Sequence, residues 1–220
     1  MILEELALLA FGMAAISTGL YTIKTRFVVL GFLLFTAYGT VIAASFADDL
    51  VQAALERTKQ NIRYDGAYFS IDYPGGDVPA NIGVCTDVVI RSYRKVGIDL
   101  QKEVHEDILA NFDLYPSKRI WGLSKPDSNI DHRRVPNLQV FFQRHGIELP
   151  ITDNARDYKA GEIVTWVLAG NLPHIGIVTD QMSADNKRPL VVHNIGSGTV
   201  LEDMLFKYQI TGHYIYNPER

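Results

Sequence analysis

A single cysteine, Cys85, occurs in the 220 residues of this sequence. One cysteine excludes an intrachain disulfide framework and a zinc site built on several cysteines. Asp131 and His132 are adjacent, but no third and fourth ligand follows at a usual spacing. We therefore predict neither a metal site nor a cofactor.

The sequence also has fewer positive than negative residues: 21 lysines and arginines and 25 aspartates and glutamates give a net charge of −4. The chain shows no basic stripe with interleaved aromatic residues, which is the electrostatic footprint of nucleic-acid binding. We therefore expect no nucleic-acid partner.

Two long apolar runs lie near the N-terminus, at residues 6–21 and 27–46, and the connector between them carries Lys24 and Arg26. This pattern is typical of membrane targeting. We predict that residues 1–47 form a signal peptide or a membrane anchor with one or two apolar segments. Because the positive residues precede the second run, the positive-inside rule places the rest of the chain outside the cytoplasm. The expected protein is periplasmic or otherwise extracytoplasmic, and is either secreted or anchored to the inner membrane.

The sequence leaves the processing of this N-terminal segment open. The run from Ser45 to Ala47 has the small-x-small form of a signal-peptidase site. Counted from Met1 the positive region is unusually long, whereas counted from Met13 the segment is an ordinary secretory signal. Cleavage, an uncleaved anchor and a two-helix hairpin therefore all remain as alternatives.

Residues 48–220 are predicted to form one α+β domain, in which N-terminal helices pack on a small antiparallel β-sheet. Helical spacing of apolar residues and cap residues predict helices at about 49–60, 85–96, 105–112 and 136–144. Short segments rich in valine, isoleucine and aromatic residues predict strands at 163–168, 174–180, 190–194 and 212–216.

Cys85 lies at the predicted start of the second helix, because Val84, Val88 and later apolar residues recur at helical spacing before the cap at Gly97. Free amide hydrogens and the positive end of the helix dipole at such a position stabilise a thiolate and lower the thiol pKa. Cys85 is therefore a candidate nucleophile. A buried cysteine that serves as a small hydrophobic side chain is the alternative.

His174 begins the second predicted strand, and His193 and Asn194 end the third. Pairing these strands as a hairpin places His174 opposite Asn194, or opposite His193 if the register differs by one residue. Gly176 on the same face would leave room for a close approach. A nucleophilic thiol needs such a base and a group that orients it, although a satisfied structural histidine is the simpler alternative.

Two further pairs of residues are candidate substrate contacts. Arg133 and Arg134 are adjacent and can hold a carboxylate in a fork geometry, although a solvated loop is the default interpretation of this charged stretch. Tyr68 and Tyr73 lie in a loop rich in glycine and proline that leads to Cys85, where they either line a cleft or anchor the loop.

Four motifs follow one another in a fixed order between about residues 49 and 216. They are Cys85 at a helix start, Gly161-Glu162-Ile163-Val164 at a strand start, His174-Ile175-Gly176-Ile177-Val178 on the next strand and Val192-His193-Asn194 on the one after. This set resembles the NlpC-type branch of papain-like cysteine peptidases, and within it an uncharacterised family of bacterial envelope proteins. The resemblance implies a papain-like fold with Cys85 as nucleophile, His174 as base and His193 as the residue that orients the base.

The chain departs from that family next to the cysteine. Thr86-Asp87 stands where the family commonly has Ser-Gly, and Val84 stands where an acidic residue often precedes the cysteine. A carboxylate at Asp87 that faced the thiol would oppose thiolate formation. Both the activation of Cys85 and the substrate class depend on how the structure resolves this conflict.

The resemblance and the expected location together imply peptidoglycan or its stem peptides as the substrate. The expected activity is hydrolysis of an amide bond through a thioester intermediate, by a stem-peptide endopeptidase or, as second choice, a muramyl-alanine amidase. A catalytically altered envelope module that binds peptidoglycan and a thiol-dependent acyltransferase on the same fold are the alternatives. The membrane is a further partner if the N-terminal segment is not cleaved.

Overall fold

The computed structural model describes residues 45–218, so the predictions for residues 1–44 lie outside the described part of the chain. The helices are α1 (Phe46–Arg57), α2 (Cys85–Lys95), α3 (Leu100–Ala110), α4 (Ser117–Trp121) and α5 (Val135–His145), with 3-10 turns η1 (Phe112–Leu114), η2 (Asp131–Arg133) and η3 (Ala155–Asp157). The strands are β1 (Arg63–Tyr64), β2 (Ile82–Gly83), β3 (Ile147–Glu148), β4 (Ile163–Leu168), β5 (Leu172–Met182), β6 (Pro189–Asn194), β7 (Thr199–Glu202) and β8 (Gln209–Ile215).

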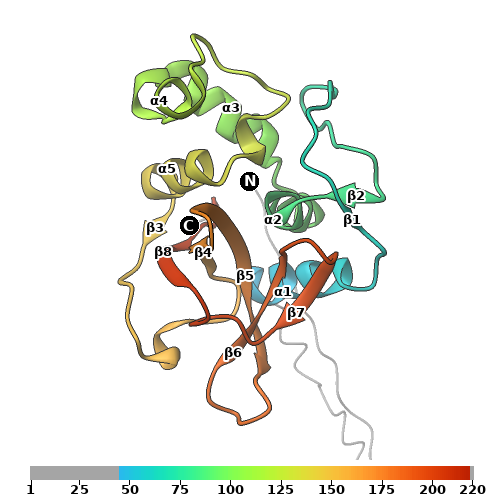
Figure 1. The fold of residues 1–220 in the computed structure, drawn as a ribbon, viewed down its shortest axis with the longest axis vertical. Helices are drawn as coiled ribbons and strands as arrows, with labels where there is room; N and C mark the ends of the chain where they lie inside the picture. The colour runs from blue at the N-terminus through green and yellow to red at the C-terminus, as the bar shows by residue number, and fades with distance from the viewer. Residues whose placement is uncertain (1–44, 219–220) are drawn as a thin grey trace, which may run out of the picture. The chain divides into compact units, whose positions relative to one another are not determined.

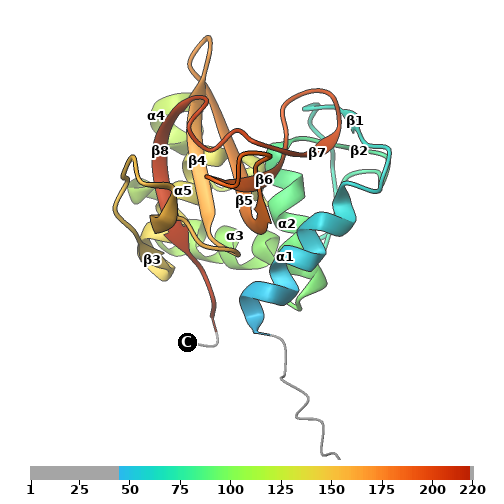
Figure 2. The ribbon, with the colours of Figure 1, turned by 90° about the horizontal axis from the view of Figure 1, so that it is seen from below.

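The helices pack against an antiparallel sheet with the strand order β3-β8-β4-β5-β6-β7 (Figures 1 and 2). Helix α1 packs beside α2, and both contact strand β5. Successive strand residues point to opposite faces, which divides the buried apolar side chains into two clusters. Ile175 and Val192 pack against the helices, whereas Trp166 and Val178 pack on the other face with the segment that follows β7. The predicted α+β class with an antiparallel sheet is confirmed.

The register between β5 and β6 differs from the predicted hairpin. Ile177 pairs with Val192, and the same register places His193 beside Gly176 and not directly opposite His174. An irregularity between Val178 and Met182 shifts the pairing, as extra residues in one strand of an antiparallel pair do. His174 and His193 nevertheless share a face of the sheet, as diagonal neighbours.

Helix α3 begins earlier than predicted, at Leu100 instead of about residue 105. The side chain of Asp99 accepts a hydrogen bond from the N–H of Gln101 and so caps the helix at that point. Leu100, Val104 and Ile108 are fully buried at a spacing of four residues. Helix α4 and strands β1, β2, β3 and β7 were not predicted, because each is five residues long or shorter and shows no periodic pattern.

The first described residues belong to α1 itself. Ser45 caps the helix by accepting from the N–H of Asp48 at 3.2 Å, and Asp48 accepts in return from the N–H of Ser45 at 3.0 Å. The ring of Phe46 lies 6.1 Å from that of Tyr93, between centroids. The predicted boundary between residues 47 and 48 therefore falls inside the first turn of α1. No helix within residues 45–218 is long and apolar enough to cross a membrane.

Replacing Ser45 with alanine is expected to lower the free energy of unfolding by about 1 kcal/mol, because one N-terminal amide of α1 loses its partner. Urea denaturation of the two proteins measures the difference. Ser45→Thr keeps the hydroxyl acceptor and should retain most of the stability. Equal stability of the wild type and Ser45→Ala would mean that this first turn contributes nothing to the domain.

Candidate active site

Cys85 is the first residue of α2, and its side chain is buried. The preceding residue, Val84, has extended backbone and offers no side-chain cap. Asp87 supplies the cap instead, since its carboxylate accepts from the N–H of Val84 at 2.7 Å. The same carboxylate forms a buried ion pair with Arg133, with two N–O distances of 2.9 Å. The charge of Asp87 is therefore balanced by a guanidinium.

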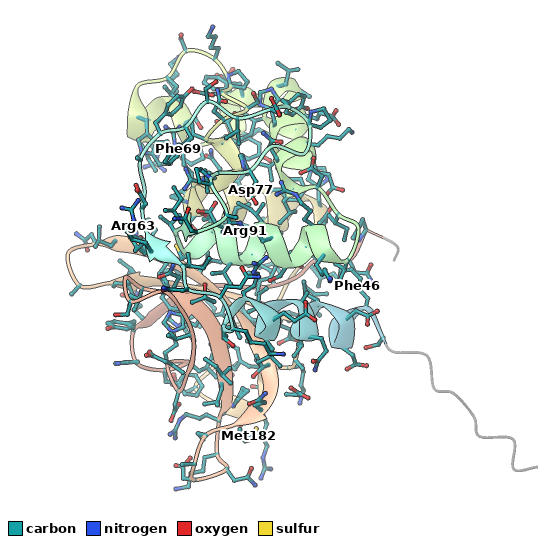
Figure 3. All side chains as sticks on the ribbon, turned by 90° about the vertical axis from the view of Figure 1, so that its right-hand side faces the viewer. Phe46, Arg63, Phe69, Asp77, Arg91 and Met182 are labelled. Atoms are coloured by element: carbon teal, nitrogen blue, oxygen red, sulfur yellow. The ribbon has the colours of Figure 1, made fainter. Side chains whose placement is uncertain are left out.

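Arg91 of α2 holds the loop that leads into the cysteine. Figure 3 shows Arg91 and Asp77 lying close together, and Arg91 Nε donates to the Asp77 carboxylate at 2.9 Å. The same guanidinium donates to the carbonyls of Ile82 (2.9 Å) and Val78 (3.2 Å). Because these carbonyls belong to the loop that leads to Gly83 and Cys85, the backbone that enters α2 is fixed from within its own helix.

The thiol of Cys85 lies against the backbone of β5. Val178 exchanges backbone hydrogen bonds with Glu162 and Gly161 on the β4 side, so by alternation the N–H of Ile175 points toward β6. The ladder between β5 and β6 begins only at Ile177, which leaves that N–H for the thiol. A hydrogen bond from the Ile175 backbone lowers the pKa of the Cys85 thiol. The sulfur is therefore placed beside Ile175, the chain neighbour of His174.

Burial dominates the electrostatics of the cysteine and raises the pKa of the Cys85 thiol to about 12, and the charge of Asp87 adds to the rise. Backbone hydrogen bonds from Ile175, Thr86 and Cys85 itself oppose it. The lowered pKa expected from a helix start is therefore wrong for this site, because desolvation outweighs the helix end. A neutral thiol needs a base before it can act as a nucleophile.

His174 and His193 form a buried pair. His174 Nε2 lies 3.0 Å from His193 Nδ1, and the two rings are perpendicular with centroids 5.1 Å apart. Desolvation, assisted by His193, lowers the pKa of His174 to about 3. Both imidazoles are therefore neutral near pH 7, so one of the two facing nitrogens donates and the other accepts. With Nε2 engaged, Nδ1 is the His174 nitrogen that is left to act on a thiol.

Gly176 makes this pair sterically possible. A Cβ atom at this position would lie 2.7 Å from Val191 Cγ1, 2.9 Å from the carbonyl oxygen of Val192 and 3.2 Å from His193 Cβ. Real Cβ atoms do not approach backbone so closely, so any side chain at 176 would push β6 away from β5. The sequence-based expectation that this glycine permits a close approach agrees with the structure.

The other predicted contacts lie in several places. Asn194 donates to the carbonyl of Gly83 at 3.3 Å, so the structure brings His193, and not Asn194, to the imidazole of His174. Arg133 is buried and also donates to the carbonyl of Ala67 at 3.2 Å. Its donors are thus used inside the protein, which corrects the view of this arginine as an outward substrate contact.

Arg134 stacks its guanidinium on the ring of Trp121 at 4.0 Å. Its Nη1 is buried and has no hydrogen-bond partner among residues 45–218. The hydroxyl of Tyr68 donates to Asp127 at 3.1 Å, and Tyr73 packs edge-on against a histidine of α3. Both tyrosines keep large exposed surfaces. Of the predicted substrate contacts, Arg134 therefore retains an unused donor, whereas Tyr73 is directed to α3.

Tyr64 belongs to the tyrosine-containing loop that is a candidate lining for a cleft beside Cys85. It pairs with Gly83 across β1 and β2; burial raises the pKa of its hydroxyl, and the neighbouring Cys85 raises it further. Glu202 of β7 has Oε2 at 3.4 Å from His193 Nε2. Glu202 was not anticipated from the sequence, because it lies on an unpredicted strand and gave no local signal.

The fold and site together define an α+β protein with a helix-initial cysteine packed against a sheet that carries a histidine pair. Residues 51–216 match the family described as domain of unknown function DUF1287, and the chain belongs to this family. It is 51% identical over 167 residues to the Escherichia coli (strain K12) protein named "Uncharacterized protein YijF", which covers 76% of this chain and 80% of that protein.

Two solved structures of N-acetylmuramoyl-L-alanine amidases from Bacteroides uniformis also resemble the chain. The first has a TM-score of 0.47 and 13% identity, and covers 78% of this chain and 99% of that one. The second has a TM-score of 0.44 and 14% identity, and covers 76% of this chain and 96% of that one. Likeness at this level does not extend to an activity.

Replacing Gly176 with alanine is expected to destabilise the protein by roughly 1–3 kcal/mol, because the new methyl group overlaps β6. Chemical denaturation measures this loss. Gly66→Ala is a matched control, because a Cβ there would meet only Val84 Cγ1 at an ordinary 3.7 Å. Unchanged stability of Gly176→Ala would show that β5 and β6 can separate at no cost.

The buried His174 also predicts a pH dependence of stability. Its pKa falls from 6.5 to about 3 on folding, so between these values the unfolded chain binds the extra proton and stability declines as the pH falls. In His174→Gln the slope of unfolding free energy against pH should decrease, by up to about 1.4 kcal/mol per pH unit. Denaturation series from pH 3 to 7 test this, and identical slopes would contradict a neutral buried imidazole.

Proposed function

We propose that this protein is an extracytoplasmic cysteine hydrolase that cleaves an amide bond in cell-wall peptidoglycan. The observation that carries the proposal is the 3.0 Å contact between His174 and His193. His174 lies on β5, and the backbone of the next residue, Ile175, lies against the Cys85 thiol. The resemblance of the ordered sequence motifs to NlpC-type, papain-like peptidases supports the same assignment of roles. The location outside the cytoplasm rests on the charge pattern of residues 1–47.

In the proposed reaction His174 Nδ1 removes the proton of Cys85 Sγ, and the thiolate attacks the carbonyl carbon of the amide. The carbon–nitrogen bond then breaks, and the amine leaves with the proton that His174 carried. A water molecule, deprotonated by His174, attacks the thioester, releases the acid and restores the thiol. His193 holds the imidazole in position throughout these steps.

The approach of sulfur to imidazole is part of this proposal. We propose that the thiol, which lies beside the Ile175 backbone, approaches the imidazole of the adjacent His174 when substrate binds, since catalytic contacts are commonly longer in an empty site than during reaction. The start of α2 provides backbone N–H groups, including that of Cys85, for the developing oxyanion. One such donor contributes about 3–4 kcal/mol to the transition state in enzymes where it has been measured.

Arg134 is the proposed anchor for the substrate. Its Nη1 donor is buried without a partner in the described residues, which costs free energy unless a ligand satisfies it. Stacking on Trp121 fixes the plane of the guanidinium. Stem peptides of the cell wall carry carboxylates, which match this donor in charge and geometry.

The burial of Cys85 favours a second candidate function. With 6% of the cysteine exposed and its pKa raised to about 12, the site also suits a module that binds peptidoglycan without cleaving it. An acyltransferase would use the same thioester but would pass the acyl group to an amine or hydroxyl in place of water. The products of the reaction distinguish these candidates from a hydrolase.

Purified peptidoglycan incubated with the wild type is expected to yield fragments that have gained one water per cleaved bond, detected by mass spectrometry. Cys85→Ala and His174→Ala should each lower turnover at least about a thousandfold, and the double variant should cost little more, because both residues act as one unit. His193→Ala should retain more activity, since it orients the base. His145→Ala removes an exposed histidine at the end of α5 and should behave as the wild type.

Full turnover by Cys85→Ala would refute the proposed function. Binding of peptidoglycan without products would favour the binding module, and products that gain an amine or alcohol in place of water would favour acyl transfer. For the anchor, Arg134→Ala should raise KM, whereas Arg119→Ala on α4 removes an equal charge and should not.

A further inference from the structure

His193 has a second nitrogen that the histidine pair does not use. Its Nε2 is buried and has no hydrogen-bond partner within residues 45–218. The carboxylate of Glu202 lies close to this nitrogen, with Oε2 at 3.4 Å from His193 Nε2. That separation is longer than an ordinary N–H···O bond. The glutamate side chain is 45% exposed, so rotation of its torsions can close the gap.

The sheet register explains why these groups meet. Glu202 pairs with Val191 across β6 and β7, while His193 pairs with Val200. Val191 and His193 are two residues apart and share a face, so Glu202 is the diagonal neighbour of His193. His174, His193 and Glu202 therefore lie on one face of three adjacent strands, the face opposite to the side chain of Ile175, and the row begins at the chain neighbour of Ile175, whose backbone lies beside the Cys85 thiol.

We propose that Glu202 is a positioning residue for the catalytic histidines, and that it selects the tautomer in which His174 can act as a base. This inference rests on the proposed roles of Cys85 and His174. A carboxylate can only accept a hydrogen bond, so it requires the proton of His193 to sit on Nε2. His193 Nδ1 is then an acceptor, and it receives the N–H of His174 Nε2.

The consequence reaches the nucleophile. With its proton on Nε2, His174 presents an unprotonated Nδ1, which is the form needed to take the thiol proton. In the opposite arrangement His193 Nδ1 would donate to His174 Nε2, and Nδ1 of His174 would carry the only proton. That tautomer cannot remove a proton from Cys85.

Glu202 also compensates charge during the reaction. When the Sγ–H bond breaks and the Nδ1–H bond forms, His174 becomes a cation next to neutral His193. The negative carboxylate beyond His193 stabilises this cation through the ring between them. Burial lowers the pKa of His193, Glu202 raises it and Lys207 lowers it. Removal of the carboxylate thus leaves only groups that oppose protonation.

The test combines nitrogen NMR of the histidine side chains with steady-state kinetics on the full chain. In the wild type we expect His193 protonated at Nε2 and His174 protonated at Nε2. In Glu202→Gln the amide can either donate to His193 Nε2 or accept from it, so the preference for one tautomer is lost and both histidines should populate the opposite tautomers to a measurable extent. The value of kcat should fall about tenfold or more, as when a wrong tautomer is imposed on a catalytic histidine, and KM should stay unchanged.

Asp203→Asn is the matched control, because it removes the same charge one residue further along, where the carboxylate pairs with Arg188. Its tautomers and kcat should equal those of the wild type. Glu202→Asp should restore the wild-type tautomers. Unchanged tautomers in Glu202→Gln, or an equal loss of kcat in Asp203→Asn, would overturn the role of Glu202. If the wild type hydrolyses nothing, the proposed function fails, while the tautomer measurement still decides this inference.

Discussion

The buried ion pair between Asp87 and Arg133 is the contact on which the geometry around Cys85 depends. One carboxylate caps α2 through the N–H of Val84 and binds the guanidinium through both of its oxygens. Arg133 in turn binds the loop at Ala67, and its carbonyl accepts from the hydroxyl of Thr86 at 3.2 Å. Loss of one partner would leave an uncompensated buried charge, which costs about 3–5 kcal/mol in comparable cases. The start of α2, the preceding loop and η2 are therefore fixed as one unit.

This ion pair also reconciles Asp87 with a nucleophilic cysteine. A carboxylate next to a thiol opposes thiolate formation, and its effect on the pKa of Cys85 is in that direction. Arg133 compensates this charge at 2.9 Å, and desolvation is the larger cause of the raised pKa. The obstacle to reactivity is therefore burial more than charge. A polar substrate in the site would reduce the desolvation of Cys85, and a neighbouring base would take up its proton. Neither effect requires the loss of Asp87.

The parts of the site that depend on local pattern could be predicted from the sequence. Helical spacing placed Cys85 at the first residue of α2, and strand β4 has the predicted bounds of 163–168. The contact of His174 with His193 was expected, but its diagonal geometry was not, because the irregularity after Val178 leaves no mark in the residue types. Contacts between residues far apart in the sequence could not be predicted either.

Arg133 illustrates the same limit, because it lies 46 residues from Asp87, and no spacing rule joins two such positions. Glu202 was missed because β7 is four residues long and follows a turn with two glycines. Sequence patterns thus identified the residue types that are capable of chemistry. Only the fold shows which of them contact each other and which make structural contacts instead.

The most direct test of the account is the rate at which Cys85 reacts with iodoacetamide as a function of pH, compared between the wild type and His174→Ala. If His174 acts on the thiol, the wild type should show a component of reactivity near neutral pH that His174→Ala lacks. Both proteins should share the rise toward the thiol pKa of about 12. Identical profiles that rise only at high pH would contradict the account, and would make Cys85 a buried structural residue.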